Sequence, residues 1–105
     1  MSVLLEFAMF PTDHGESKSA YVSRVIDLVT QSGYPYRLTP MGTIVETKTV
    51  AEALGVIEQS YAALEPDCNR VYVTAKLDIR KGKEDRMKGK LESVQKALGR
   101  EIEGL

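Results

Sequence analysis

The sequence predicts an α+β fold, a ferredoxin-like βαββαβ sandwich. A four-stranded antiparallel sheet carries two helices on one face, and an extra C-terminal helix follows. Strand-like stretches with apolar residues at alternating positions occur at residues 2–10, 34–39, 43–47 and 69–80. One stretch of helical periodicity separates the first two strands and another separates the last two. Since crossovers are right-handed, few other topologies remain.

The first strand, residues 2–10, has apolar residues on both faces, which is typical of a central strand. One face carries Val3, Leu5, Phe7 and Met9, and the other carries Leu4, Glu6, Ala8 and Phe10. A helix then begins near Ser17 or Ser19, either of which is suited to cap it. Gly33 is suited to end that helix.

Residues 36–46 are the stretch around which the chain is organised: a strand end, a turn and the next strand. Pro40 and Gly42 mark the turn, since proline presets φ and glycine tolerates positive φ. Thr49 and Glu52 then have the spacing of a capping box. The face of the second helix is expected to consist of Val50, Leu54, Ile57, Tyr61 and Leu64.

The stretch 69–80 alternates most clearly, and its odd-numbered residues from Val71 to Ile79 are expected to lie under the helices. A final helix follows, with Met87, Leu91, Val94 and Leu98 at helical spacing.

Composition limits the function classes. With 105 residues the chain has room for one domain, and its net charge of −1 argues against a general nucleic-acid binder. The single Cys68 allows no internal disulfide, which favours a reducing, cytoplasmic location. There is no signal-peptide pattern and no apolar run long enough to span a membrane. His14 has no partner at ligand spacing, so we expect no metal site.

The sheet face away from the helices has a mixed character. Its expected members include Leu4, Glu6, Phe10, Tyr72, Thr74, Lys76 and Asp78, and we favour Ile44 and Glu46 rather than Thr43 and Val45 from the hairpin. Such a face is too apolar for water and too charged for a dry core. It fits a subunit interface that encloses a polar pocket.

The sequence resembles the small thiamine-binding proteins of bacteria, archaea and yeast over about residues 6–94. The residues that carry the resemblance are Glu6-Phe7, the strand end at Pro11, Ser32-Gly33-Tyr34 with Tyr36, Met41-Gly42-Thr43-Ile44-Val45-Glu46, Lys76-Leu77-Asp78-Ile79-Arg80, and Lys90 with Val94. The Gly-Thr-x-x-Glu turn together with Asp-x-Arg is the moderately specific element. Many members have glycine after the glutamate, where this chain has Thr47, and a side chain there narrows or closes a pocket.

The resemblance implies one domain over residues 1–105, subunits that associate into dimers or tetramers, and no catalysis. It also implies a pocket for thiamine or its hydroxymethyl-aminopyrimidine half as a ligand, with no other cofactor.

Six residues are predicted to bind the ligand: Glu46, Thr43, Tyr36, Glu6, Phe10 and Asp78. The Glu46 carboxylate can accept from a protonated aminopyrimidine, or it is an edge-strand charge that faces water. For Glu6, a salt bridge with Lys76 or Arg80 is favoured over ligand contact.

The other predicted contacts also have plainer interpretations. Tyr36 and Phe10 are able to stack on a pyrimidine or face a thiazolium, and ordinary packing is equally compatible. Thr43 is near the expected pocket, or is a plain strand residue. Asp78 is expected to pair across a subunit interface, or to be exposed to solvent.

Two other functions stay open. One is a small enzyme of cofactor salvage that uses Glu6, Glu46 and Lys76 in acid–base chemistry. The other is an oligomeric regulatory module without a pocket ligand.

Overall fold

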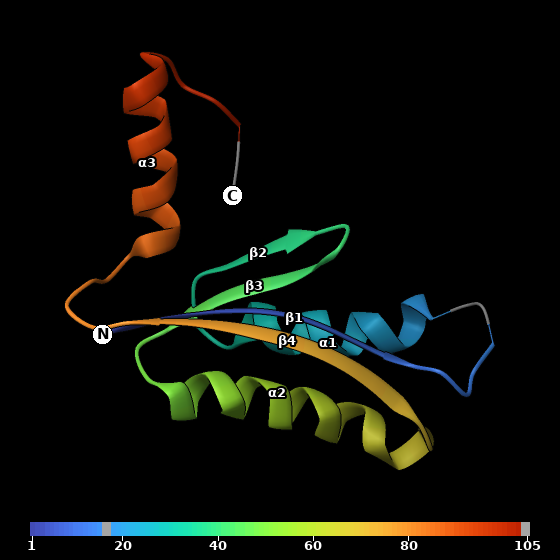
Figure 1. Ribbon diagram of the computed structural model, residues 1–105. Helices are drawn as coiled ribbons and strands as arrows, with labels where there is room; N and C mark the ends of the chain where they lie inside the picture. Colours follow the sequence, from blue (N-terminus) through green and yellow to red (C-terminus); the bar gives the residue numbers. More distant parts are fainter. Residues whose placement is uncertain (16–17, 104–105) are drawn as a thin grey trace.

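The computed structural model describes residues 1–15 and 18–103, and it confirms the α+β ferredoxin-like arrangement. The elements in chain order are β1 (Ser2–Pro11), α1 (Ser19–Gln31), β2 (Tyr36–Thr39), β3 (Gly42–Thr47), α2 (Val50–Leu64), a 3-10 turn η1 (Glu65–Asp67), β4 (Val71–Arg80) and α3 (Arg86–Leu98). The antiparallel sheet has the order β2-β3-β1-β4 (Figure 1).

Strand register assigns each side chain to one sheet face. In β1, Val3, Leu5, Phe7 and Met9 are buried and belong to the core with residues of α1 and α2. Leu4 lies opposite Glu46, and Glu6 lies opposite Ile44. Since residues directly opposite each other share a face, Ile44 and Glu46 lie on the open face, as predicted.

The two sheet-covering helices bury narrow stripes. Val25 and Val29 of α1 are buried, while α2 buries Ala53, Val56, Ser60 and Leu64. The predicted α2 face is therefore partly wrong, because Leu54 and Tyr61 are exposed. This helix has apolar residues around much of its circumference, and the small Ala53 and Ser60 form the side that lies on the sheet.

The predicted N-terminal cap is confirmed for α2 but not for α1. Thr49 and Glu52 form the predicted capping box: the Glu52 amide donates to the Thr49 hydroxyl at 3.1 Å, and the Thr49 amide donates to Glu52 Oε1 at 3.0 Å. The α1 prediction is wrong for Ser19, which is the first helical residue. Its cap position is Lys18, which makes no side-chain capping bond. Ser17 lies outside the described residues.

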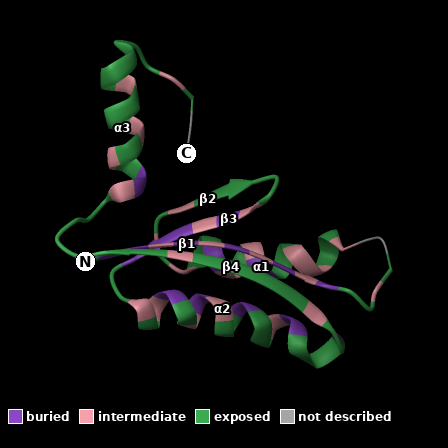
Figure 2. Cartoon of the chain, viewed as in Figure 1, coloured by how far each residue is buried: buried purple, intermediate pink, exposed green. Residues whose placement is uncertain are grey.

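β4 forms an edge of the sheet and is less covered than predicted. It pairs with β1 alone, and Val73 and Ile79 are exposed although they lie on the helix side (Figure 2). An edge strand extends past the helices that cover the central strands, so alternation alone overestimates its burial.

The last helix, α3, extends away from the end of the sheet (Figure 1). Its first turn contacts open-face residues, whereas α1 and α2 cover the opposite face. Within the described part of α3 the buried residue is Met87, and most of the helix is exposed (Figure 2).

Candidate functional site

The structure distributes the six predicted ligand-binding residues over separate places. Glu46 and Asp78 contact α3, Glu6 lies in the middle of the open face, and Tyr36 lies on the helix face. Thr43 and Phe10 border a common groove.

Glu46 is buried, with 7% of its surface exposed, and both of its oxygens accept hydrogen bonds. Oε2 accepts from the Ser2 hydroxyl at 2.6 Å and from the Arg86 amide at 2.9 Å, and Oε1 accepts from the Met87 amide at 3.1 Å. The first turn of α3 leaves amides without intrahelical partners. Glu46 therefore caps α3 from a strand forty residues earlier in the chain.

The same contacts control ionisation. Burial by itself raises the pKa of Glu46, but the hydrogen bonds from Ser2, Arg86 and Met87 and the charge of Arg86 act the other way, and the resulting pKa lies below its usual value. Glu46 is thus a carboxylate at neutral pH. In this structure its oxygens are occupied by the protein's own donors.

Thr47 does not obstruct the face on which Glu46 lies. It is opposite Val3 on the helix side, is buried, and donates to the Thr49 carbonyl at 2.9 Å. The threonine that replaces the common glycine is therefore part of the connection to α2.

Glu6 and Asp78 both have ionic partners. Lys76 Nζ lies 3.4 Å from Glu6 Oε1, which confirms the predicted pair. Asp78 contacts Arg86 Nη1 at 2.9 Å, and the Arg86 guanidinium also donates to the Ser2 and Asp78 carbonyls. These contacts add to the attachment of the start of α3.

Tyr36 is opposite Val45 and packs against the core, so it lies on the face away from Glu46 and Phe10. A single ligand on the open face does not contact it in this arrangement.

A groove forms where β1 is longer than its neighbour β3. The pairing between them ends at Phe7 and Thr43, whereas β1 continues to Pro11 beside β4. We call the resulting space of about 360 Å³, between β1, α1 and the β2–β3 turn, the hairpin groove. Its apolar wall consists of Phe7, Met9, Val22, Val25, Ile26 and Met41.

Backbone alternation places polar groups at this groove. The Glu46 amide donates to the Pro35 carbonyl, so even-numbered residues of β3 point their backbone groups toward β2 and odd-numbered residues point theirs toward β1. Phe7 therefore exchanges hydrogen bonds with Thr43. The amide and carbonyl of Met9, two residues on, face the same side beyond the end of that pairing.

Thr43 adds a hydroxyl to the groove. The residue is only 8% exposed, and among the described residues no hydrogen bond to its side chain is found. Among the described residues the fully buried side-chain oxygen without a partner is Ser60 Oγ, so the unpartnered Thr43 hydroxyl retains access to water or to a ligand in the groove.

Phe10 lies at the rim, where its ring already contacts a cation. Lys18 Nζ is 4.9 Å from the centroid of the Phe10 ring, and the exposed Tyr72 ring lies 5.7 Å from it, centroid to centroid. The rim therefore combines aromatic surface with a positive charge.

The turn that closes the groove is fixed by Thr39. Its hydroxyl donates to the Gly42 carbonyl at 2.8 Å and accepts from the Met41 and Gly42 amides. Gly42 does not have a positive φ, contrary to the expected reason for glycine. Instead, a Cβ there would lie 3.1 Å from the Phe7 carbonyl oxygen, so any larger residue would have to push the two strands apart by a few tenths of an ångström.

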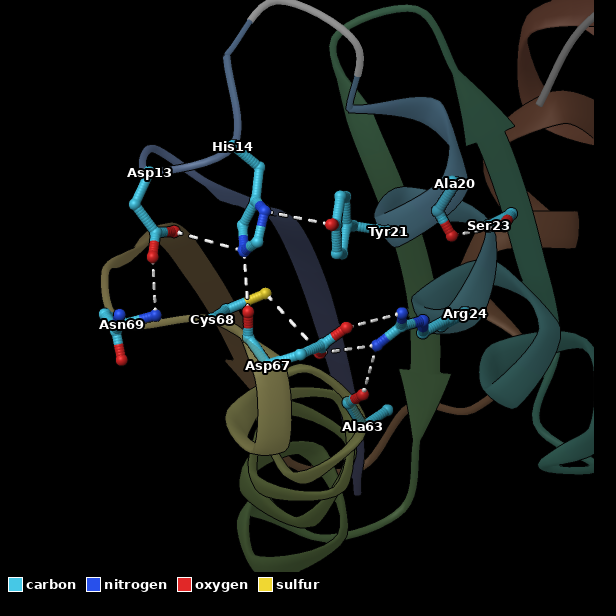
Figure 3. Close-up of polar contacts among 10 residues, drawn as sticks. All are labelled: Asp13, His14, Ala20, Tyr21, Ser23, Arg24, Ala63, Asp67, Cys68 and Asn69. Atoms are coloured by element: carbon cyan, nitrogen blue, oxygen red, sulfur yellow. Dashed lines mark hydrogen bonds and ion pairs between the residues drawn. The ribbon is translucent and has the colours of Figure 1, made fainter.

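A polar cluster anchors α1, which forms one wall of the groove (Figure 3). Arg24 binds both carboxylate oxygens of Asp67 at 2.8 Å, and this guanidinium holds the pKa of Asp67 below its usual value. His14 contacts the Tyr21 hydroxyl at 2.9 Å and the Asp67 carbonyl at 2.6 Å. His14 thus joins the loop after β1 to α1 and η1.

Cys68 is buried, and burial raises the pKa of its thiol. No group of three potential metal ligands occurs among residues 1–15 and 18–103. In the same part of the chain, no helix has the length and apolar character to cross a membrane.

Sequence reasoning missed the backbone of Met9 and the side chain of Lys18. A detectable signal for Met9 was the length of the first strand, which exceeds that of the third. No sequence pattern places Lys18 over Phe10, because the loop between them sets that contact.

Comparisons with known proteins agree with this fold. The profile of the family described as thiamine-binding protein matches residues 5–95. A UPF0045 protein of Mycobacterium bovis is 34% identical over 98 residues, which cover 93% of this chain and 96% of that protein.

Solved structures show the same architecture. A protein of Methanocaldococcus jannaschii superposes with a TM-score of 0.78 at 28% identity, over 89% of this chain and 95% of its own. A Thermotoga maritima protein described by thiamine biosynthesis or salvage gives a TM-score of 0.76 over 90% of this chain and 99% of its own. At 18% identity the second likeness concerns the fold alone.

Proposed function

Because the chain belongs to the thiamine-binding protein family, we propose that it binds thiamine or its hydroxymethyl-aminopyrimidine half without transforming it, and that the hairpin groove is the binding site. One observation carries the choice of site. The groove brings together Thr43 and Phe10, two predicted ligand contacts, beside backbone groups of Met9 that lie beyond the strand pairing.

The chemistry of the groove suits an aminopyrimidine. The flat ring has apolar faces, and on one edge it carries a nitrogen acceptor next to an amine donor. The Met9 backbone supplies a donor and an acceptor, Thr43 supplies a hydroxyl, and the groove wall is apolar. Binding then uses groups that the folded chain leaves available, whereas Glu46 is already occupied.

Calorimetric titration with hydroxymethyl-aminopyrimidine tests the site through Thr43→Val, which keeps the side-chain shape and removes the hydroxyl. Loss of one neutral hydrogen bond of about 0.5–1.5 kcal/mol predicts about 2- to 12-fold weaker binding. Thr30→Val, the same replacement at an exposed position of α1, is the control. Unchanged affinity in Thr43→Val would remove the groove from the proposal.

The same titration examines Glu46 as a direct ligand contact. Such a contact requires that the first turn of α3 leaves the carboxylate. If Glu46→Gln abolishes binding while Thr43→Val does not, the ligand lies at the α3 end of the open face.

Self-association belongs to the same proposal. The rim of the groove reaches the open face, where Tyr72 is 51% exposed and Phe10 half-buried. A second copy against this face would cover aromatic surface and close the rim, which supports a dimer or tetramer. Light scattering of the purified protein tests this, and a monomer at all concentrations would contradict it.

The absence of catalysis is tested separately. The Glu6–Lys76 pair shares the open face with Glu46, but the Glu46 oxygens are engaged with Ser2 and α3. Incubation with thiamine should leave it intact by mass spectrometry. Accumulation of a product would favour the salvage-enzyme alternative.

A further inference from the structure

The ammonium group of Lys18 lies over the ring of Phe10, a residue that lines the hairpin groove. Lys18 Nζ lies 4.9 Å from the centre of the Phe10 ring. Cations within about 6 Å of a ring centre are attracted by its negative face. The Phe10 ring is therefore already engaged by a positive charge that belongs to the protein.

The position of Lys18 in α1 does not account for a positive charge. Lys18 is the cap residue at the helix N-terminus, where the helix dipole disfavours cations, and the first turn contains no acidic residue. A small polar side chain would serve this position better. The contact with Phe10 gives the lysine a role at the groove.

We infer that Lys18 determines which ligands the groove accepts, by discriminating against cationic ones and favouring neutral or anionic ones. This rests on the proposed function at the groove. Thiamine carries a permanent thiazolium charge, which would have to displace the ammonium from Phe10 or lie beside it. The hydroxymethyl-aminopyrimidine half is uncharged when its ring is unprotonated, and its phosphate ester is anionic. The selected class is thus the pyrimidine and its phosphate rather than thiamine.

The test is a titration of wild-type, Lys18→Gln and Lys18→Arg proteins with these three probes, at a pH where the pyrimidine is unprotonated. Lys18→Gln should bind thiamine about two- to fivefold more tightly, the size of one exposed cation–aromatic contact. Its affinity for the neutral pyrimidine should be unchanged, and that for the phosphate ester should fall. Lys18→Arg keeps the charge and should behave as wild type.

The direction in which each of the three affinities changes distinguishes an effect of charge from an effect of side-chain shape. A steric effect of the replacement would move all three affinities in one direction, and such a result would overturn the inference, as would equal affinities in wild type and Lys18→Gln. In both cases the proposed function stands, since binding itself persists. If none of the probes binds wild type or Lys18→Gln, the proposed function fails and the inference fails with it.

Discussion

Replacing Glu46 by glutamine should release the first turn of α3 from the sheet. The neutral side chain retains one oxygen and presents the NH2 group of its carboxamide, itself a donor, to the other backbone donor, so one of the two α3 amides loses its acceptor. Loss of a helix cap costs about 1 kcal/mol, and loss of a negative charge at a helix N-terminus costs about 0.3–1 kcal/mol. The sum, about 1.3–2 kcal/mol, corresponds to roughly 10- to 30-fold more frequent opening.

Amide hydrogen exchange measured residue by residue detects this opening. The Arg86 and Met87 amides should lose about 10- to 30-fold protection, while the amides of Val3 and Leu5 in the central strand should keep theirs. Glu84→Gln is the matched control, since it removes one nearby negative charge without removing a hydrogen bond seen in the structure.

Equal protection of the α3 amides in Glu46→Gln and wild type would refute this reasoning. It would mean that Arg86, through its contacts with Ser2 and Asp78, holds the helix without the carboxylate.

Three further outcomes follow from the structure. The lowered pKa of Glu46 means that its stabilisation is complete above the unfolded value of about 4.3 and is lost as pH falls through the lower folded value. The protection factors of the α3 amides, corrected for the intrinsic exchange rate at each pH, should therefore fall on acidification in wild type and stay constant in Glu46→Gln. Gly42→Ala should lower the thermal midpoint and weaken ligand binding, because its Cβ would lie 3.1 Å from the Phe7 carbonyl oxygen; an unchanged midpoint would show that the strands separate without strain. Cys68 should react with a thiol reagent more slowly in the folded protein than after unfolding in denaturant, since burial raises the thiol pKa, and equal rates would contradict its burial.

The fold was predictable because its signals are local. Alternation in β1, helical spacing in α1 and the Thr49–Glu52 box each depend on residues a few positions apart. The errors arose where tertiary position decides. The edge location of β4 exposes Ile79, and the orientation of α2 exposes Leu54, although both residues fit the sequence pattern.

The candidate site was predictable only in part. Thr43 and Phe10 were identified, but their common groove depends on where the pairing of β1 with β3 stops. Glu46 accepts hydrogen bonds from the amides of Arg86 and Met87, which lie 40 and 41 positions later in the chain. No local sequence pattern predicts a helix cap that comes from another element. Residue type singled out the Glu46 carboxylate, but it did not predict the internal donors that Glu46 binds.

Because β1 is longer than β3, the length of the β2–β3 hairpin determines the size of the hairpin groove. The pairing of β1 with β3 ends at Phe7 and Thr43, and the residue that would pair with Met9 lies in the turn. To place a strand residue opposite Met9, the hairpin would have to be longer by one residue in β2 and one in β3. Two such inserted residues would extend the hairpin along β1. Their backbone would form hydrogen bonds with the amide and carbonyl of Met9, and the longer β3 would occupy the groove, whatever side chains the inserted residues carried. The size of the hairpin groove is therefore set by the number of residues in the hairpin, and a change of two residues would fill or open it.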